Sequence, residues 1–334
     1  MTGKLNIVQY GLDPLGCEVL RNLDGHPGLK VVAAIDPGLA GSDRSISEAT
    51  QISGYEDAPI FASFGEVPPT SRPDAVFHTA GTGIRETLEQ LRPLCENGLT
   101  VVTSCGEMLY PWLRAPELAS EIDRVCRRNN ARVVGSGTNP GSGLNLLPIS
   151  MAGLTGKIRG VFAESVSDAV GWHRPLQDRL GLGSGPEDFR EGWANGRLGQ
   201  AGLHESLLVI AHSLGWNIPA MDQWCEPIIA DREFRLSRGI VARGQVRGLH
   251  QIIRAFTPAR ESIQLELKVV LEAEDPHDLV RIQGDNPIEA RIPGGLQGGR
   301  SKAWALIKTL PRLRPLAPGL KLITDLPAAA GFAL

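Results

Sequence analysis

The segment from Val8 to Gly16, VQYGLDPLG, has the glycine spacing of a turn that holds a phosphate. An apolar run ends at Gly11, a second glycine follows at Gly16, and the helix-like stretch CEVLRNL comes next. The glycines permit a tight turn and close helix packing, and the N-terminus of the following helix offers N–H groups to a phosphate. The central position, where a glycine usually lets the backbone approach a pyrophosphate, is Asp13.

A second acidic residue supports a dinucleotide. Asp36 ends the apolar run KVVAAID, 20 residues beyond Gly16, where an acid accepts hydrogen bonds from ribose hydroxyls. A nucleotide fold with an empty crevice remains the alternative, because a carboxylate beside a pyrophosphate costs energy unless it points away. We therefore expect Asp13 to point to solvent or to cap the following helix, where its charge suits the helix dipole.

The elements that position these residues alternate regularly through the first third of the chain. We expect strands at residues 5–10, 30–36, 73–81, 99–105 and 131–137, and helices at residues 15–23, 85–98 and 116–130. Strands that alternate with helices indicate βαβ units, and continuous Val, Ile and Ala runs indicate a buried parallel sheet. The pattern predicts an α/β fold with a doubly wound parallel sheet.

Ligands of such sheets bind beyond the carboxyl ends of the strands. The residues expected to bind the dinucleotide are Gly11, Leu12, Asp13, Pro14, Leu15, Gly16, Asp36, Thr79, Ala80, Gly81, Thr82, Ser104, Cys105, Asn139 and Pro140. Of these, Thr79, Thr82, Ser104, Asn139 and Pro140 are expected to shape the nicotinamide side. Glu107 follows the same edge and is the candidate for acid–base chemistry.

The pattern of expected strands and helices changes at the loop GSGTNPGSG, residues 135–143. Beyond it, helical patterns at residues 185–196 and 203–216 mix with strand-like runs at residues 238–256 and 261–273, which indicates an α+β domain with a mixed or antiparallel sheet. The expected domains are residues 1–138, 139–300 and 301–334. The last begins with a helix at 301–313 whose apolar stripe must be buried.

Composition excludes several classes of partner. A net charge of −3 gives no reason to expect nucleic acid or an anionic membrane, and no apolar run reaches the roughly 20 residues that span a bilayer. The N-terminus runs straight into the first strand, which leaves no room for a signal peptide. The five cysteines are scattered without a CxxC pair, so we expect free thiols and a cytoplasmic location.

The histidines do not form a metal-binding motif. His204 and His212 are eight residues apart on one expected helix, further ligands are missing, and no HExxH spacing occurs, so no metal is expected. His250 lies on an expected strand of the second domain and is the histidine that we expect to line a substrate pocket.

Seven motifs in order over most of the chain resemble one family. They are YGLDPLG, VVTSCGEMLYPW, GTNPG, GLHESLLVIAHSLGW, GLHQ, EDPHDLVRIQG and IPGGLQGGRSKAWALIKTLPRL with APGLKLITDLP. The sequence resembles the dihydrodipicolinate reductase-like superfamily, and more closely its 2,4-diaminopentanoate dehydrogenase and native amine dehydrogenase branch. The resemblance implies a Rossmann-type domain, an inserted substrate and dimerisation domain that forms a homodimer, and a C-terminal helix that returns to the first domain.

The same resemblance implies an activity. It implies NADP- or NAD-dependent interconversion of an amine with a carbonyl compound and ammonia, in which Glu107 matches the catalytic glutamate. Trp172, His173 and Arg174 fall where the superfamily places substrate contacts, although a purely structural loop fits them equally well. Asp36 favours a free ribose hydroxyl, and Arg44 is a candidate partner for a 2′-phosphate.

Three positions depart from the family pattern, Asp13, Gly106 and Gly299. They keep two alternatives open, a relative that binds a nucleotide or metabolite without turnover and a dehydrogenase of the same fold for another carbonyl or amino-acid substrate.

Overall fold

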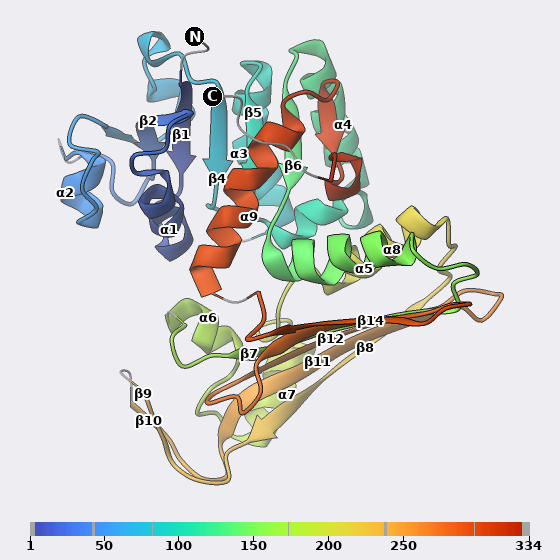
Figure 1. Ribbon diagram of the computed structural model, residues 1–334. Coiled ribbons are helices and arrows are strands. Elements are labelled where there is room, and N and C mark those ends of the chain that lie inside the picture. The colour runs from blue at the N-terminus through green and yellow to red at the C-terminus, as the bar shows by residue number, and fades with distance from the viewer. Residues whose placement is uncertain are drawn as a thin grey trace. The chain divides into compact units, whose positions relative to one another are not determined.

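The computed structural model describes residues 4–41, 44–81, 83–172, 174–236, 239–296 and 298–328. The chain divides into two compact units (Figure 1). Met1–Gly141 and Gly299–Leu334 form the first unit, and Ser142–Gly298 forms the second. The sequence placed these divisions at residues 138 and 300.

A parallel sheet is the centre of the first unit. Within the described residues its strands are β1 (Leu5–Tyr10), β2 (Leu29–Ile35), β3 (Ile60–Phe61), β4 (Ala75–His78), β5 (Thr100–Thr103), β6 (Arg132–Gly135) and β15 (Gly319–Lys321). Their spatial order is β15-β6-β5-β4-β1-β2-β3, and every neighbouring pair is parallel. The strand order reverses between β1 and β4, which is where doubly wound sheets bind ligands. The predicted fold class is confirmed.

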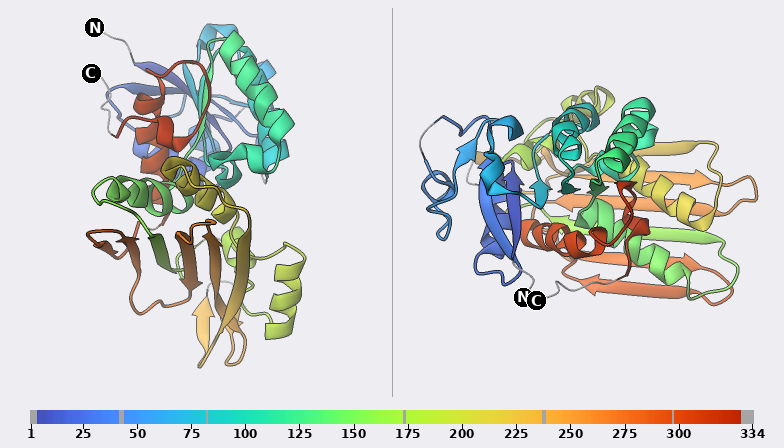
Figure 2. Two further views of the ribbon diagram at one scale, coloured as in Figure 1. Left: turned by 90° about the vertical axis from the view of Figure 1, so that its right-hand side faces the viewer. Right: turned by 90° about the horizontal axis from the view of Figure 1, so that it is seen from above.

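Helices cover both faces of this sheet. The helices of the first unit are α1 (Pro14–Leu23), α2 (Ile46–Thr50), α3 (Ile84–Glu96), α4 (Pro116–Arg128) and α9 (Gly298–Leu313). The views in Figure 2 show α4 and α9 on opposite sides of the sheet. The apolar stripe expected on α9 is buried, namely Ala303, Leu306, Ile307 and Leu310, and Leu313 is buried as well. Short 3-10 turns connect several elements at Phe64–Glu66, Pro69–Ser71, Gly106–Leu109, Pro111–Leu113 and Ile323–Asp325.

The second unit is a mixed sheet with helices. Its strands are β7 (Gly160–Asp168), β8 (Met221–Ile229), β11 (Val246–Phe256), β12 (Ser262–Val270), β13 (His277–Gln283) and β14 (Ile288–Pro293), in the order β14-β13-β7-β12-β11-β8. Within this second sheet, β7 and β12 are the only parallel neighbours among the described pairs. Its helices are α5 (Leu147–Ala152), α6 (Arg174–Arg179), α7 (Pro186–Ala194) and α8 (Leu203–Leu214).

The strand-like run at residues 238–256 contains two strands. It is divided into β10 (Gly239–Val241), which pairs with β9 (Phe234–Leu236), and β11. Gly244 lies between the two strands at a φ of 88°, a left-handed conformation that glycine adopts without strain and that ends an extended run.

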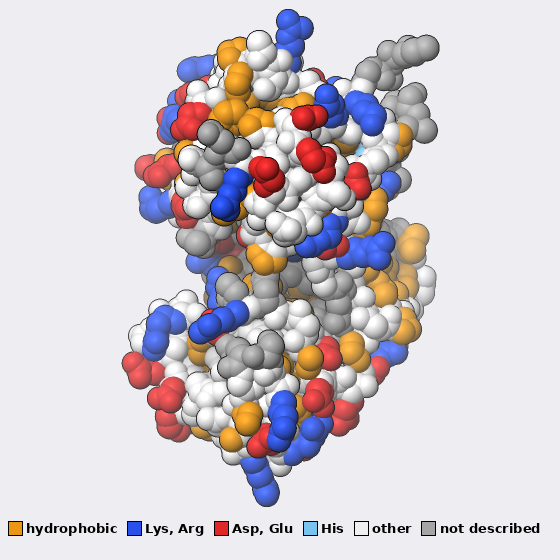
Figure 3. Space-filling view, turned by 90° about the vertical axis from the view of Figure 1, so that its left-hand side faces the viewer, with side chains coloured by type: hydrophobic (Ala, Val, Ile, Leu, Met, Phe, Trp, Pro, Cys, Tyr) orange, Lys and Arg blue, Asp and Glu red, His pale blue; other side chains and the backbone are white. Residues whose placement is uncertain are grey.

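Charged side chains of both signs are interspersed on the face drawn in Figure 3. In the described ranges, no helix has both the length and the hydropathy that a bilayer-spanning helix requires.

Candidate active site

The glycine turn at residues 11–16 joins β1 to α1 at the carboxyl edge of the parallel sheet. Gly11 has a φ of 94°, and a Cβ there would lie 2.7 Å from the Ala80 nitrogen. A Cβ on Gly16 would lie 2.0 Å from the Gly11 carbonyl oxygen. Both positions therefore require glycine, one for its backbone angle and both for space. The expected tight turn and close helix packing are present.

Asp13 caps α1, as the sequence predicted. Its extended backbone precedes Pro14 at the first helical position, and its Oδ1 accepts a hydrogen bond from the Gly16 N–H at 2.7 Å. Asp13 and Pro14 are exposed, whereas Leu12 and Leu15 are buried. The capping bond satisfies one helix N–H and places the negative charge at the positive end of the helix dipole.

Asp36 follows β2 and is tied to the turn. Its Oδ2 accepts a hydrogen bond from the Leu12 N–H at 2.9 Å, and its Oδ1 accepts one from Gly38 at 3.0 Å. A carboxylate has about four acceptor positions, so acceptor capacity remains for ribose hydroxyls. The acid is held beside the turn, as a ribose-binding residue would need to be.

Thr79, directly after β4, supports the turn at residues 11–16 through the hydrogen bonds of its side chain. Its hydroxyl is buried, donates to the Gly11 carbonyl oxygen at 3.0 Å and accepts from Gln9 Nε2 at 3.0 Å. Gln9 Nε2 also donates to the Gly11 carbonyl oxygen at 2.9 Å. The two side chains fix the peptide that turns toward α1. Sequence reasoning missed Gln9, although a glutamine in an otherwise apolar buried strand is a signal of an internal polar contact.

His78 precedes Thr79 and is fully buried. Its Nε2 lies 2.9 Å from Gln90 Oε1, an atom that can only accept, so Nε2 carries the proton. Nδ1 then accepts from the Thr103 hydroxyl at 3.0 Å. Burial lowers the pKa of His78 to about 4. This neutral imidazole links the ends of β4 and β5 to α3.

Glu107 lies on the 3-10 turn Gly106–Leu109 beyond β5. Its Oε2 accepts a hydrogen bond from the Ile84 N–H at 2.7 Å, at the first turn of α3. Its Oε1 lies 3.0 Å from Nε of Arg114, and the side chain is 17% exposed against 41% for Arg114. The carboxylate is thus oriented by a helix N-terminus and a guanidinium while it keeps contact with solvent.

The remaining candidates of the first unit follow three adjacent strands. Ser104 and Cys105 come directly after β5, and Asn139 and Pro140 lie in the segment after β6. The Ser104 N–H donates to the His78 carbonyl oxygen at 2.9 Å. The segment Thr138–Leu146 departs from helical dihedral angles from Asn139 to Gly141. Ala80 and Gly81 follow β4, so these residues share one edge of the sheet with Glu107. Thr82 lies outside the described residues.

Lys302, on the second turn of α9, was not predicted for this site. Its Cε lies 3.7 Å from the position of a Cβ on Gly137, in the loop after β6. Burial lowers the pKa of the Lys302 ammonium, and the ionisable groups of Asp13 and Cys105 act in the opposite direction. A signal was present in the sequence, because Lys302 is four residues from Leu306, in the apolar stripe, and so shares its helix face.

The expected substrate residues of the second unit do not come together. Trp172 packs against the buried cluster that includes Leu249 and Val269. His250 alternates with Leu249 along β11 and therefore points to the opposite face of the sheet. Arg174 is largely exposed, with Nε 3.8 Å from Oδ2 of Asp178. His173 lies outside the described residues.

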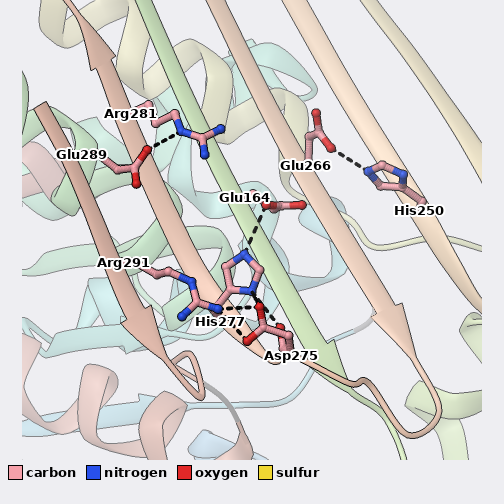
Figure 4. A network of polar contacts seen from close by, with 8 residues as sticks. All are labelled: Glu164, His250, Glu266, Asp275, His277, Arg281, Glu289 and Arg291. Carbon is pink, nitrogen blue, oxygen red and sulfur yellow. Dashed lines mark hydrogen bonds and ion pairs between the residues drawn. The ribbon is translucent and has the colours of Figure 1, made fainter. Parts of the chain in front are cut away.

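His250 belongs to a row of polar contacts on that opposite face (Figure 4). Its Nε2 lies 2.7 Å from Oε2 of Glu266, and this contact lowers the pKa of Glu266. In the same row, His277 Nε2 lies 3.3 Å from Oε2 of Glu164. Among the described residues, no group of three or more His, Cys, Asp and Glu side chains could hold a metal ion.

Known proteins share this architecture. The chain is 27% identical over 331 residues to 2,4-diaminopentanoate dehydrogenase of Acetoanaerobium sticklandii, covering 97% of this chain and 94% of that protein. The structure of an amine dehydrogenase from Mycobacterium smegmatis has a TM-score of 0.86 at 21% identity and covers 98% of this chain and 97% of that one.

A more distant structure is scyllo-inositol dehydrogenase from Lactobacillus casei with bound NAD(H). It has a TM-score of 0.54 at 17% identity and covers 86% of this chain and 76% of that one. These structural likenesses confirm the fold. Residues 143–333 match the family described as the 2,4-diaminopentanoate dehydrogenase C-terminal domain, and the chain belongs to that family.

Proposed function

We propose that the protein is an NAD(P)-dependent oxidoreductase acting on CH–NH2 groups. It would convert a small ketone or aldehyde and ammonia into an amine and catalyse the reverse oxidative deamination. The family and the names of two similar proteins, 2,4-diaminopentanoate dehydrogenase and amine dehydrogenase, support this reaction class.

The turn at residues 11–16 fits a nicotinamide dinucleotide. The N–H groups of Asp13 and Leu15 remain for a phosphate, and the Asp36 carboxylate keeps acceptor capacity for ribose. The dinucleotide supplies or accepts the hydride when it is bound. Asp36 favours NAD, and Arg44, on the loop after β2, is the candidate partner of an NADP 2′-phosphate, so we propose that both are accepted.

The position and contacts of the Glu107 carboxylate are the observation that best supports the proposal. Its carboxylate lies at the carboxyl edge of the sheet, is fixed by Ile84 and Arg114, and is still reached by solvent. There it would take a proton from ammonium or return one to a departing oxygen, and its charge would stabilise a neighbouring iminium. Because both oxygens are already held, the carboxylate is oriented before a substrate arrives.

Nucleotide binding without turnover is the second candidate. The Leu12 and Gly16 N–H groups donate to Asp36 and Asp13, so fewer donors face a phosphate than in an all-glycine turn. The contacts that hold Glu107 are also compatible with a structural role. This reading predicts cofactor binding with no reaction.

Titration of NADH and NADPH into the protein, followed by nicotinamide fluorescence, tests the first step. A screen of ketones and aldehydes with ammonia then tests turnover. Binding together with amine formation supports the oxidoreductase. Binding without amine formation across the screen favours the second candidate, and no binding at millimolar cofactor would refute both.

We also propose a homodimer formed through the face of the second sheet that bears His250. Arg254 lies 5.6 Å from the ring of Trp224 and 5.2 Å from that of Phe256, and Phe256 is 45% exposed. Aromatic residues and arginine are enriched in interfaces. Light scattering should give twice the mass of 35.9 kDa, and Phe256→Asp should lower it. A monomeric wild type would contradict the dimer. The five cysteines are free thiols, and we therefore propose that the protein is located in the cytoplasm.

A further inference from the structure

Lys302 belongs to the first turns of α9, which lie between α1 and the loop after β6. On one side, a Cβ on Gly299 would lie 3.6 Å from Glu18 Cγ, which belongs to the first turns of α1. On the other side, Lys302 Cε approaches Gly137, just beyond β6. The Ser136 hydroxyl, 2.8 Å from the Thr309 hydroxyl, fixes the next turns of α9. The start of α9 therefore lies between α1 and the end of β6.

The ammonium of Lys302 is not neutralised by the protein. Among the described residues it has neither a hydrogen-bond partner nor an ion-pair partner, and it is half-buried. Asp13 and Cys105 act on its charge without a bond to it. A cation partly removed from water without a partner costs free energy, and a bound anion would offset that cost.

The glycine turn at residues 11–16 has few N–H groups left to bind an anion. Its Gly16 and Leu12 N–H groups are taken by the carboxylates of Asp13 and Asp36, and Pro14 has no N–H. Two negative side chains thus lie where a diphosphate would approach, and only the N–H groups of Asp13 and Leu15 remain. A diphosphate at this turn needs a positive charge from another element.

We propose that Lys302 binds the diphosphate of the nicotinamide dinucleotide and offsets the carboxylate of Asp13. This assignment rests on the proposed cofactor. Lys302 supplies the donors that the turn has given to its own acids, and the diphosphate supplies the anion that Lys302 lacks. The residue that offsets the negative charge of Asp13 therefore comes from the C-terminal part of the chain.

The test compares Lys302→Met with Lys308→Met, which removes the same charge from an exposed position of the same helix. Lys308 Nζ lies 5.5 Å from the Trp304 ring. Affinities are measured by fluorescence for NADH and by competition for ADP-ribose, which keeps the diphosphate, and for adenosine, which lacks phosphate. Hydrogen bonds to charged groups contribute about 1.5–3 kcal/mol, which corresponds to roughly 10- to 150-fold in affinity.

We expect Lys302→Met to weaken the binding of NADH and of ADP-ribose by that factor and to leave the binding of adenosine unchanged. Lys308→Met should keep wild-type affinities. Lys302→Arg should retain most of the affinity and serves if the methionine variant does not fold. Asp13→Asn combined with Lys302→Met should regain part of the loss, because the local charge returns to its wild-type value.

Unchanged affinities in Lys302→Met would overturn the proposal. Loss for NADH with no loss for ADP-ribose would also overturn it, because it would assign Lys302 to the nicotinamide or the substrate. A wild-type protein that binds neither NADH nor ADP-ribose would instead refute the proposed function itself.

Discussion

Glu107 Oε2 accepts a hydrogen bond from the Ile84 N–H at 2.7 Å, which joins the end of β5 to the first turn of α3. The same carboxylate pairs with Arg114. Two roles are therefore combined in one residue, the support of a helix N-terminus and the candidate acid–base function. A pair of variants separates them.

Glu107→Gln should lower the rate of amination by about 10² to 10⁴, the usual cost of truncating an acid–base group. Cofactor affinity should stay close to that of the wild type, because the amide still accepts from Ile84. The measurement is turnover with ammonia and a ketone, with NADH fluorescence on the same samples. Arg114→Gln is the matched control, since it breaks the ion pair and keeps the carboxylate. Equal rate losses in both variants would mean that the ion pair, and not proton transfer, is required.

Asp13→Gly should tighten NADH binding several-fold. The change frees the Gly16 N–H for a phosphate and removes a negative charge, whereas a glycine cap costs only a few tenths of a kcal/mol relative to aspartate. Asp13→Asn keeps the capping group without the charge and isolates the electrostatic part. Weaker binding in both variants would show that the carboxylate itself contributes to the cofactor site.

Gly16→Ala should destabilise the first unit and abolish cofactor binding. The new Cβ would lie 2.0 Å from the Gly11 carbonyl oxygen, so α1 or the turn must move, and overpacking of this kind costs about 1–3 kcal/mol. Gly171→Ala, where nothing lies within 4 Å of the added Cβ, is the control. Urea unfolding and NADH titration give both readouts. A fully stable, binding-competent Gly16→Ala would contradict the close packing.

His78 should make the first unit less stable in acid. Its folded pKa of about 4 lies below the value of 6.5 in an unfolded chain, so the unfolded state takes up the proton first as the pH falls. Stability is complete above pH 6.5 and decreases toward pH 4, by about 3 kcal/mol at 1.36 kcal/mol per unit. Urea unfolding across this range measures the slope.

His78→Gln should flatten this slope while lowering stability at neutral pH, because the bonds to Gln90 and Thr103 are lost. His212→Gln, an exposed change on α8, should leave the slope unchanged. A slope that persists in His78→Gln would assign the acid sensitivity to other groups.

The sequence allowed the first unit to be predicted in detail for a physical reason. The elements around Leu5–Tyr10 and Pro14–Leu23 carry local signals, a continuous apolar strand, glycine at a required φ and a capping aspartate, and each acts within a few residues. The position of Asp36 beside Leu12 followed from the order of parallel strands alone.

The strands of the second unit were harder to predict from the sequence, because they depend on contacts between residues far apart in the chain. β8 contains Pro227 and lies at the sheet edge, where a proline is tolerated but the strand pattern is weakened. β7 carries Glu164 in a central strand, and the carboxylate is accommodated by His277 from a neighbouring strand. Lys302 was missed because a lysine on a helix usually indicates solvent, although its spacing of four residues from Leu306 places it on the face of the apolar stripe.

The pairing of β15 with β6 has a consequence for the order in which the protein forms during synthesis. Gly319–Lys321 completes the parallel sheet from near the end of the chain, whereas Ser142–Gly298 is already whole some twenty residues earlier in the sequence. A ribosome therefore releases the second unit before the first can close, and until then β6 is an open sheet edge of the kind that recruits other strands. The unit that is translated first is the last to be finished.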